Sequence, residues 1–421
     1  CPLDCTPSSE PPWRHLPGSV SSDTSTQYGP LVFVCSGGLL YGRLTVGLRA
    51  YVYTGFGGGF RNVDCLGNGD PSVCTDPDYQ IDPAADQDVT LFVAELSVPV
   101  QVTLIPDKLS IGLSLRVPWA RQDVTAHQDT PSMCGLGPCA EDDPARARPN
   151  IQQAAQTMNG FGIPGILFGI SARPIDGLTL ALVYRSKVWI DMAGETTLPG
   201  ALGTLVGAIP TTTRWYVPHM LRFGVAHKSW NDRFTVAFDF RYQFHREANK
   251  EQVFTLDPPA RFASLVPNPT VADFTWKDAF TGILGAELWV APRVPIRVGF
   301  SMGRSASNPD TMTPFSPPPG LQMAAYAGFG VRAGPLDVDM AFGWGGGPSY
   351  TIENNAPGCV DADDRPDMAG GSGLTAQGGC AGTYDVDSWF LSLSATYTLG
   401  RGSSPQPEPD LRQSDAPADL S

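Results

Sequence analysis

The sequence of 421 residues contains no run of about 18 apolar residues, so it has no candidate transmembrane helix. Charged residues are only 17% of the chain, below the roughly 25% of an average soluble domain. The net charge is -14 and basic runs are absent, which argues against binding to nucleic acid. The chain also lacks GxSxG, HExxH and phosphate-loop motifs. We therefore expect no enzyme, no metal site and no cofactor.

Turn-forming residues are abundant instead, with 46 glycines and 40 prolines. So many turn residues are unusual in a helical protein and are typical of many strands joined by turns. The stretch RFTVAFDFRYQFHRE, 233–247, alternates strictly. As a strand it places Phe238 and Phe240 on one face and Asp239 and Arg241 on the other.

The same alternation recurs along the chain and predicts an all-β protein. We count about thirteen candidate strands. They lie near 28–38, 42–54, 89–104, 108–119, 160–173, 177–191, 212–228, 232–247, 274–291, 294–305, 319–333, 335–347 and 384–400.

The connections between these strands alternate between short turns, such as IPDK and HKSWND, and long loops, such as 120–159 and 348–383. An antiparallel up-and-down barrel in the bacterial outer membrane has this pattern, with short periplasmic turns and long outer loops. Its apolar face meets lipid and its polar face lines a lumen. Alternation alone equally allows a soluble sandwich or propeller whose apolar face packs inward.

Thirteen is an odd number, whereas bacterial single-chain barrels have even strand counts. We therefore expect one further strand upstream of the given sequence. Residues 1–27 are expected to be an extracellular loop, 28–400 a transmembrane β-barrel and 401–421 a disordered periplasmic tail.

Eight of the nine cysteines form four local pairs in polar segments rich in Gly, Pro and Asp, which predicts disulfides and an oxidising compartment. A zinc site and a lipidated N-terminal cysteine are the alternatives. Cys35 is left over and is expected to be a buried free thiol. The paired cysteines are Cys1, Cys5, Cys65, Cys74, Cys134, Cys139, Cys359 and Cys380.

Three segments carry a resemblance to a known family: LTLALVYRSKV (178–188), TTTRWYVPHMLRFGVAHKSWNDRFTVAFDFRYQ (211–243) and WKDAFTGILGAELWV (276–290). They resemble the FadL family of outer-membrane transporters for long-chain fatty acids and other hydrophobic compounds. The resemblance implies a monomeric, 14-stranded barrel surrounded by outer-membrane lipids. It also implies passive diffusion of a fatty acid or hydrocarbon from an outer groove to a lumen pocket and a lateral exit. In this family an N-terminal plug with an Asn-Pro-Ala turn closes the lumen. The given sequence contains no Asn-Pro-Ala.

The apolar segment TLPGALGTLVGAIP, 197–210, falls in an expected outer loop. An exposed apolar loop is typical of a binding surface, although it could equally pack over the barrel mouth. The opposite groove wall is expected at 150–162, beginning as a short helix. The candidate groove residues are Leu198, Leu202, Leu205, Val206 and Ile209.

Alternation places many charged residues in the lumen, Glu95 and Arg116 among them. Opposite charges there mostly pair with each other, but one or two cations could hold a fatty carboxylate. Arg185 and Lys187 are favoured because they share one face of a strand. The full candidate set is Arg185, Lys187, Arg222, Arg241 and Arg297.

Glycines follow an early strand in GFGGGF, 55–60. The resemblance implies a strand kink and lateral exit here, and ordinary loop flexibility is the alternative. Pro99 and Pro164 mark similar weak points in other strands. The candidate kink residues are Gly55, Gly57, Gly58 and Gly59.

The sequence therefore predicts an outer-membrane transporter that takes up hydrophobic small molecules. Two other functions fit the same barrel: a water-filled porin for polar solutes, and a structural or adhesive surface protein.

Overall fold

The computed structural model describes residues 22–23, 33–39, 43–60, 87–130, 133–134, 137–138, 150–198, 200–264, 266, 268–309, 319–352, 382–384 and 387–398. The expected tail, 401–421, and most of the expected N-terminal loop lie outside these residues. So do the side chains of the nine cysteines. The disulfides and the free thiol therefore stay predictions.

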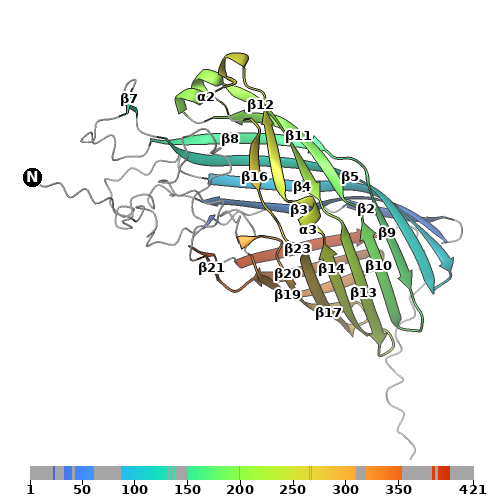
Figure 1. Ribbon diagram of the computed structural model, residues 1–421. Helices are drawn as coiled ribbons and strands as arrows, with labels where there is room; N and C mark the ends of the chain where they lie inside the picture. The colour runs from blue at the N-terminus through green and yellow to red at the C-terminus, as the bar shows by residue number, and fades with distance from the viewer. Residues whose placement is uncertain are drawn as a thin grey trace, which may run out of the picture.

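The described residues are mostly β-structure, built on one antiparallel sheet of 19 strands with two small two-stranded sheets beside it (Figure 1). The strands are Ser22–Asp23 (β1), Phe33–Leu39 (β2), Leu44–Phe60 (β3), Gln87–Ile105 (β4), Leu109–Thr130 (β5), Met133–Cys134 (β6), Gly137–Pro138 (β7), Asn150–Phe161 (β8), Gly165–Ala172 (β9), Leu178–Arg185 (β10), Val188–Thr197 (β11), Ala208–Val217 (β12), Met220–Ser229 (β13), Phe234–Gln243 (β14), Glu251–Leu256 (β15), Thr270–Asp273 (β16), Ala279–Ala291 (β17), Val294–Arg304 (β18), Leu321–Ala333 (β19), Leu336–Gly346 (β20), Tyr350–Ile352 (β21), Gly382–Tyr384 (β22) and Asp387–Tyr397 (β23).

Among the described residues, helical structure is confined to the short helices α2 (Gly200–Val206) and α3 (His245–Ala248) and a 3-10 turn at Ala260–Phe262. Gly207 follows the last residue of α2, and its positive φ of 76° is a conformation that glycine adopts without strain. Within the described ranges, no helix is long and apolar enough to cross a membrane.

Every predicted strand segment contains a strand, and three segments are each split in two. The segment 160–173 is divided between β8 and β9 around Pro164, as its proline suggested. The segment 177–191 divides at Ser186–Lys187, and 212–228 divides at Pro218–His219. Pro99, by contrast, lies inside β4 and pairs with Ser114 without a break.

These splits separate the sheet into a lower and an upper part that share the long strands β3, β4 and β5. In the lower part, β5 is followed by β9, β10, β13, β14 and β17, then by β18, β19, β20 and β23. In the upper part, β5 pairs with β8, which is followed by β11, β12, β15 and β16. Among the described strands, no pairing joins β23 to β2, so the sheet is not closed.

The expectation that 150–162 begins as a short helix is wrong. Residues 150–161 form β8, which pairs with β5 on one side and with β11 on the other. Two partner strands satisfy its backbone hydrogen bonds, and its alternating side chains Gln156 and Met158 are buried.

The lower part confirms the predicted outward apolar face. Phe238 and Phe240 are exposed, whereas Asp239 between them bonds to Arg222. The short turns that the structure describes lie at this end, for example Ile105–Leu109 and Ser229–Phe234. Exposed apolar side chains in a regular alternating pattern fit a lipid-facing wall.

The upper part has the reverse arrangement, with charges outside and apolar side chains inside. Its outer face carries exposed ion pairs between Arg214 and Asp191 at 2.6 Å and between Arg121 and Asp123 at 2.7 Å. Its inner face includes Val93, which is fully buried. The outer surface of this part is thus suited to water, and its interior to apolar groups.

Candidate functional site

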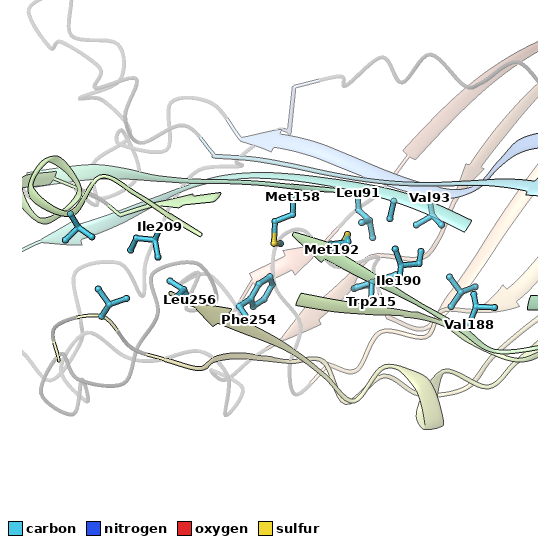
Figure 2. Close-up of a cluster of buried hydrophobic side chains, with 14 of the residues drawn as sticks. Leu91, Val93, Met158, Val188, Ile190, Met192, Ile209, Trp215, Phe254 and Leu256 are labelled. Carbon is cyan, nitrogen blue, oxygen red and sulfur yellow. The ribbon is translucent and has the colours of Figure 1, made fainter. Parts of the chain in front are cut away.

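The interior of the upper part is filled by an apolar cluster to which β4, β5, β8, β11, β12 and β15 all contribute. Figure 2 shows labelled side chains from β4, β8, β11, β12 and β15 converging on one space. Fully buried members come from neighbouring strands of the wall, such as Met158 on β8 and Ile190 on β11. We call this set the upper apolar cluster: Leu91, Val93, Ala120, Met158, Val188, Ile190, Met192, Val206, Ile209, Trp215, Val217, Phe254, Leu256, Phe262 and Val266.

Strand β4 runs from this cluster into a polar layer without any break. Leu91 and Val93 belong to the cluster, and Glu95 and Ser97 follow on the same face, all of them buried. On the outer face of the same strand, Leu96 is exposed. The interior therefore changes from apolar to charged within two residues.

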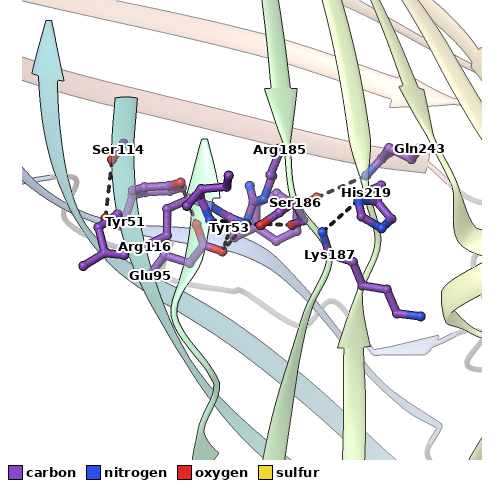
Figure 3. A network of polar contacts seen from close by, with 12 residues as sticks. Tyr51, Tyr53, Glu95, Ser114, Arg116, Arg185, Ser186, Lys187, His219 and Gln243 are labelled. Carbon is purple, nitrogen blue, oxygen red and sulfur yellow. Dashed lines mark hydrogen bonds and ion pairs between the residues drawn. The ribbon is translucent and has the colours of Figure 1, made fainter. Parts of the chain in front are cut away.

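The polar layer centres on Glu95, whose side chain is fully buried between two arginines. Arg116 Nη1 donates to Glu95 Oε1 at 2.8 Å, and Arg185 Nη2 donates to the same oxygen. Tyr51 donates its hydroxyl to Glu95 Oε2 at 2.7 Å. Arg116 Nη2 also donates to the backbone oxygen of Ser186 at 2.8 Å, which ties the layer to the break between β10 and β11 (Figure 3).

This layer holds one carboxylate against two guanidinium groups, which leaves one positive charge in excess. The Nε atoms of Arg116 and Arg185 are buried without a hydrogen-bond partner. A buried donor without a partner costs about 1–3 kcal/mol, and more when it is charged. The arrangement therefore offers two charged donors to an anionic group that reaches this depth.

Tyr53 connects the apolar cluster to the polar layer. It lies at a β-bulge between Val52 and Thr54, and its ring packs against the cluster. The Arg185 guanidinium lies 3.3 Å from the centre of the same ring, and Gln243 donates to the Tyr53 hydroxyl at 3.3 Å. Because β3 and β14 are separated by several strands of the sheet, these contacts cross the lumen (Figure 3). We refer to Tyr53, Glu95, Arg116, Arg185 and Gln243 as the lumen floor.

The buried polar side chains of the upper part are hydrogen-bonded to each other. Gln252 donates to Gln122 at 3.3 Å, and Gln156 donates to Thr196 at 3.1 Å. Thr211 also donates to Thr196, at 2.8 Å. Bonded to each other, these groups have no need of water, so they can remain inside an apolar interior.

The predicted lumen cations do not form a single site. Arg185 points into the lumen floor, whereas Lys187 lies 4.9 Å from the Tyr216 ring and donates to the backbone oxygen of Glu247 at 3.5 Å. The strand break at Ser186 places these two cations in different surroundings (Figure 3). Arg222 contacts both oxygens of Asp239 at 2.7 Å.

Arg297 lies in a separate region of the lower part. It donates to Glu287 at 2.7 Å and to Asp339 at 2.5 Å, so its charge is compensated. A cavity of about 280 Å³ is lined by Arg297, Asp339, Tyr326, Ser392 and Ser394 together with small and apolar residues of the neighbouring strands. Arg241 has a buried Nε without a hydrogen-bond partner.

Some of the predicted groove residues are packed in the interior, and one is exposed. Val206 and Ile209 are buried in the upper apolar cluster, and Leu198 packs against it. Leu205 of α2 is 62% exposed. Leu202 lies in α2, but its side chain is outside the described residues.

The candidate kink in β3 pairs with β4 throughout. Gly55 lies opposite Phe92, and Gly59 lies opposite Asp88. The irregularity of β3 lies at Tyr53 instead, just before the glycines. A lateral exit at these glycines stays a prediction.

Sequence reasoning placed Glu95, Arg116 and Arg185 in the lumen by alternation, but it missed Tyr53 and Gln243. Alternation places Tyr53 on the same face as Tyr51, two residues earlier, so the sequence carried a signal that could have found it. No cluster of three or more potential metal ligands occurs in the described part of the chain.

Comparisons with known proteins agree with this architecture. A FadL homologue from Pseudomonas aeruginosa has a TM-score of 0.62 at 16% identity, over 86% of this chain and 77% of that one. The toluene transporter TodX of Pseudomonas putida has a TM-score of 0.52 at 13% identity, covering 76% and 77% of the two chains. The toluene transporter TbuX of Ralstonia pickettii has a TM-score of 0.50 at 16% identity, covering 72% and 73%. Identities this low establish similarity of fold alone.

Among curated proteins, no relative matches the chain. Residues 77–399 match the family described as outer membrane protein transport protein, OMPP1/FadL/TodX. This match spans every strand from β4 to β23. The chain therefore belongs to the OMPP1/FadL/TodX family of outer-membrane transport proteins.

Proposed function

We propose that this protein takes up hydrophobic small molecules through the outer membrane by passive diffusion. The observation that carries the proposal is the upper apolar cluster, an apolar interior inside a part of the barrel whose outer face bears exposed ion pairs. A water-filled pore would have polar side chains at these positions. An apolar interior instead offers a hydrophobic molecule an environment better than water.

The proposed path begins at helix α2. Leu205 presents an exposed apolar side chain, and Val206 of the same helix is already part of the cluster. A ligand that lands on this helix can enter the interior along a continuous apolar surface. The buried cluster residues must move apart to admit it.

The path does not continue straight down the lumen. The lumen floor crosses the interior directly below the cluster and holds three charged side chains. Displacing hydrogen-bonded charged groups is unfavourable in free energy for a hydrocarbon chain, whereas transfer into the apolar lipid around the barrel is favourable. Sideways release into the membrane therefore follows from the chemistry of the interior. It requires no energy source beyond the concentration gradient.

The polar end of an acidic ligand would bind at the lumen floor. Arg185 and Arg116 provide two buried Nε donors and an excess positive charge. Charge-assisted hydrogen bonds to a carboxylate are stronger than neutral ones. We do not include Lys187 in the proposed site, because it lies against the Tyr216 ring instead of the lumen floor, so Arg185 is the member of the pair that the proposal keeps.

A water-filled porin is the second candidate, and the charged and hydroxyl side chains at one side of the cavity beside Arg297 favour it. The lumen floor opposes it, because its side chains span the interior above that cavity. A purely structural or adhesive role has no specific observation in its favour.

The test is mass spectrometry of compounds that co-purify with the protein after extraction in a detergent distinguishable by mass. We expect hydrophobic molecules bound to the wild type. Fatty acids should be depleted in Arg185→Ala and retained in Lys187→Ala. A wild type that carries no hydrophobic compound, and that binds none when a long-chain fatty acid or toluene is added, would contradict the proposed function.

A further inference from the structure

The outward-facing row of side chains on β18 changes from apolar to cationic at its upper end. Phe300 and Met302 are exposed on this face, and Arg304 follows on the same face and is also exposed. The sheet neighbours of Arg304 are aromatic, because Arg304 lies opposite Phe280, and Phe280 lies opposite Tyr242 of β14. A cation thus stands in the last outward row of the sheet, directly above large apolar side chains.

This last row lies at the upper limit of the lipid-facing wall. Strand β14 contains ten residues between the lower turn and α3. At about 3.3 Å per residue and a tilt of about 40°, this length corresponds to a height of roughly 25 Å, which is the height of a lipid-facing apolar band. Aromatic side chains such as Tyr242 and Phe280 are typical of that boundary. The residues just above the row therefore lie beside the headgroups of the outer leaflet.

Two further cations lie next to Arg304 at this level. Lys277 N donates to the backbone oxygen of Ala306 at 2.7 Å, which places Lys277 beside the segment that follows β18. The residue after Lys277 is Asp278, whose Oδ1 accepts a hydrogen bond from Arg246 N of α3 at 2.9 Å. Arg246 is exposed and Lys277 is half-buried. Hydrogen bonds between neighbouring segments thus join the end of β18, the approach to β17 and α3 in one row.

A fourth cation, Lys187, continues this row on the other side of α3. Its Nζ donates to the backbone oxygen of Glu247 in α3 at 3.5 Å and lies 4.9 Å from the centre of the Tyr216 ring. Tyr216 stands between the buried residues Trp215 and Val217, so its side chain belongs to the outer face of β12. We call the following four residues the cation belt: Lys187, Arg246, Lys277 and Arg304.

The cation belt differs from the charged outer face of the upper part in lacking ion pairs. On that face, Arg121 and Arg214 are each paired with an aspartate. In the described part of the chain, no ion pair engages a member of the belt. Two carboxylates, Glu247 and Asp278, lie among its four cations, so the belt keeps an excess of positive charge. A chain with a net charge of -14 therefore concentrates uncompensated cations at the level of the headgroups.

We propose that the cation belt binds the phosphate groups of a phosphorylated glycolipid in the outer leaflet, with the acyl chains of that lipid lying on the apolar row below it. The guanidinium groups of Arg246 and Arg304 match the oxygens of a phosphate with two parallel hydrogen bonds, whereas the lysines act as point charges. Phe280, Phe300 and Met302 supply the exposed apolar surface for the acyl chains. The surface lies outside the barrel, so the proposal does not depend on what passes through the interior.

The test is native mass spectrometry of the full chain in detergent micelles, titrated with diphosphoryl lipid A. Arg246→Gln/Arg304→Gln removes two charges and keeps long polar side chains. We expect this variant to bind lipid A at least about tenfold more weakly than the wild type, since each cation near an anionic lipid contributes about fivefold. Arg173→Gln/Arg293→Gln is the matched control, because it removes two exposed cations at the lower turns, and it should match the wild type.

Two further ligands show which part of the lipid is recognised. Monophosphoryl lipid A should bind more weakly than the diphosphoryl form, and inorganic pyrophosphate at the same concentration should not displace lipid A. Equal binding of both lipids, or displacement by pyrophosphate, would overturn the proposal in favour of acyl chains alone or of a free anion.

The variants decide the location of the site. Equal affinities of the wild type and a folded Arg246→Gln/Arg304→Gln, or a wild type that binds no lipid A, would overturn the proposal. Should the double variant fail to fold, the single variants Arg304→Gln and Lys277→Gln decide, each with an expected loss of about fivefold. Uptake of hydrophobic compounds is measured separately, so failure of lipid A binding leaves the proposed function standing.

Discussion

The guanidinium of Arg185 lies 3.3 Å from the centre of the Tyr53 ring, so a side chain of β10 meets a side chain of β3 inside the barrel. Three other strands, β4, β5 and β9, separate them in the sheet. Gln243 extends the contact to β14. The contact crosses the lumen at the boundary between the apolar interior and the charged one.

Replacing Tyr53 with Ala should open the lumen to ions. The substitution removes the ring beneath Arg185 and the acceptor for Gln243, so the two sides of the floor lose their contact. We expect Tyr53→Ala to show larger and longer openings than the wild type in planar-bilayer recordings. Tyr397→Ala is the control, because Tyr397 is exposed on the outer face of β23. Identical recordings for Tyr53→Ala and the wild type would show that another structure closes the lumen.

Glu95→Gln should strongly destabilise the protein. The change leaves Arg116 and Arg185 buried without a counter-charge, and breaking a buried ion pair typically costs about 3–5 kcal/mol. Asp191→Asn removes an exposed ion pair with Arg214, worth about 0–1 kcal/mol, and is the matched control. Unfolding by guanidinium in detergent micelles measures both. A loss of stability no greater for Glu95→Gln than for Asp191→Asn contradicts the assignment of Glu95 as the centre of the floor.

How far the sequence predicts this fold depends on which part of the sheet is considered. In β14, Phe238 and Phe240 alternate with Asp239 and Arg241, so the face on which one side chain lies fixes the face of the next. In the upper end of β4, Leu91, Phe92 and Val93 are all apolar, so alternation cannot distinguish the inner face from the outer one. The apolar side chains face outward in the lower part and inward in the upper part. This exchange of faces therefore becomes visible only in the three-dimensional structure.

Strand breaks explain the remaining differences between the faces predicted by alternation and the faces found in the structure. Alternation through 177–191 placed Val188 on the same outer face as Leu182, but Val188 is fully buried and Leu182 is 50% exposed. The break at Ser186–Lys187 shifts the register by one residue, which exchanges the two faces. Neither Gly nor Pro marks this break in the sequence. The sequence therefore gives no signal that Arg185 and Lys187 lie in different surroundings. At Pro164 and Pro218, prolines do accompany the breaks.

Met192→Glu should weaken ligand binding by at least about tenfold, which corresponds to about 1.4 kcal/mol. It introduces a carboxylate into the upper apolar cluster, where Met192 is 1% exposed. Ala193→Glu is the matched control, because its side chain is exposed on the opposite face of β11. Binding of a fluorescent fatty acid to folded protein gives the affinities. Equal affinities for the two variants mean that ligand binds outside the cluster.

Leu205→Ser should slow uptake without changing stability. Leu205 is 62% exposed on α2, so its apolar surface is available to an arriving ligand and contributes little to packing. We expect the initial uptake rate at limiting ligand to fall by roughly threefold, less than 1 kcal/mol. Ile175→Ser, with a similar exposure of 64% at a lower turn, should have no effect. An unchanged rate for Leu205→Ser favours the interpretation that 197–210 only packs over the barrel mouth.

The most direct test of the central claim uses one preparation of liposomes containing the wild-type protein. Entry of a radiolabelled long-chain fatty acid and of toluene is measured beside swelling in an isosmotic sugar solution. An apolar interior above a closed polar floor predicts protein-dependent entry of at least one hydrophobic compound with no swelling above protein-free liposomes. Rapid swelling without accelerated entry of either compound would contradict the account.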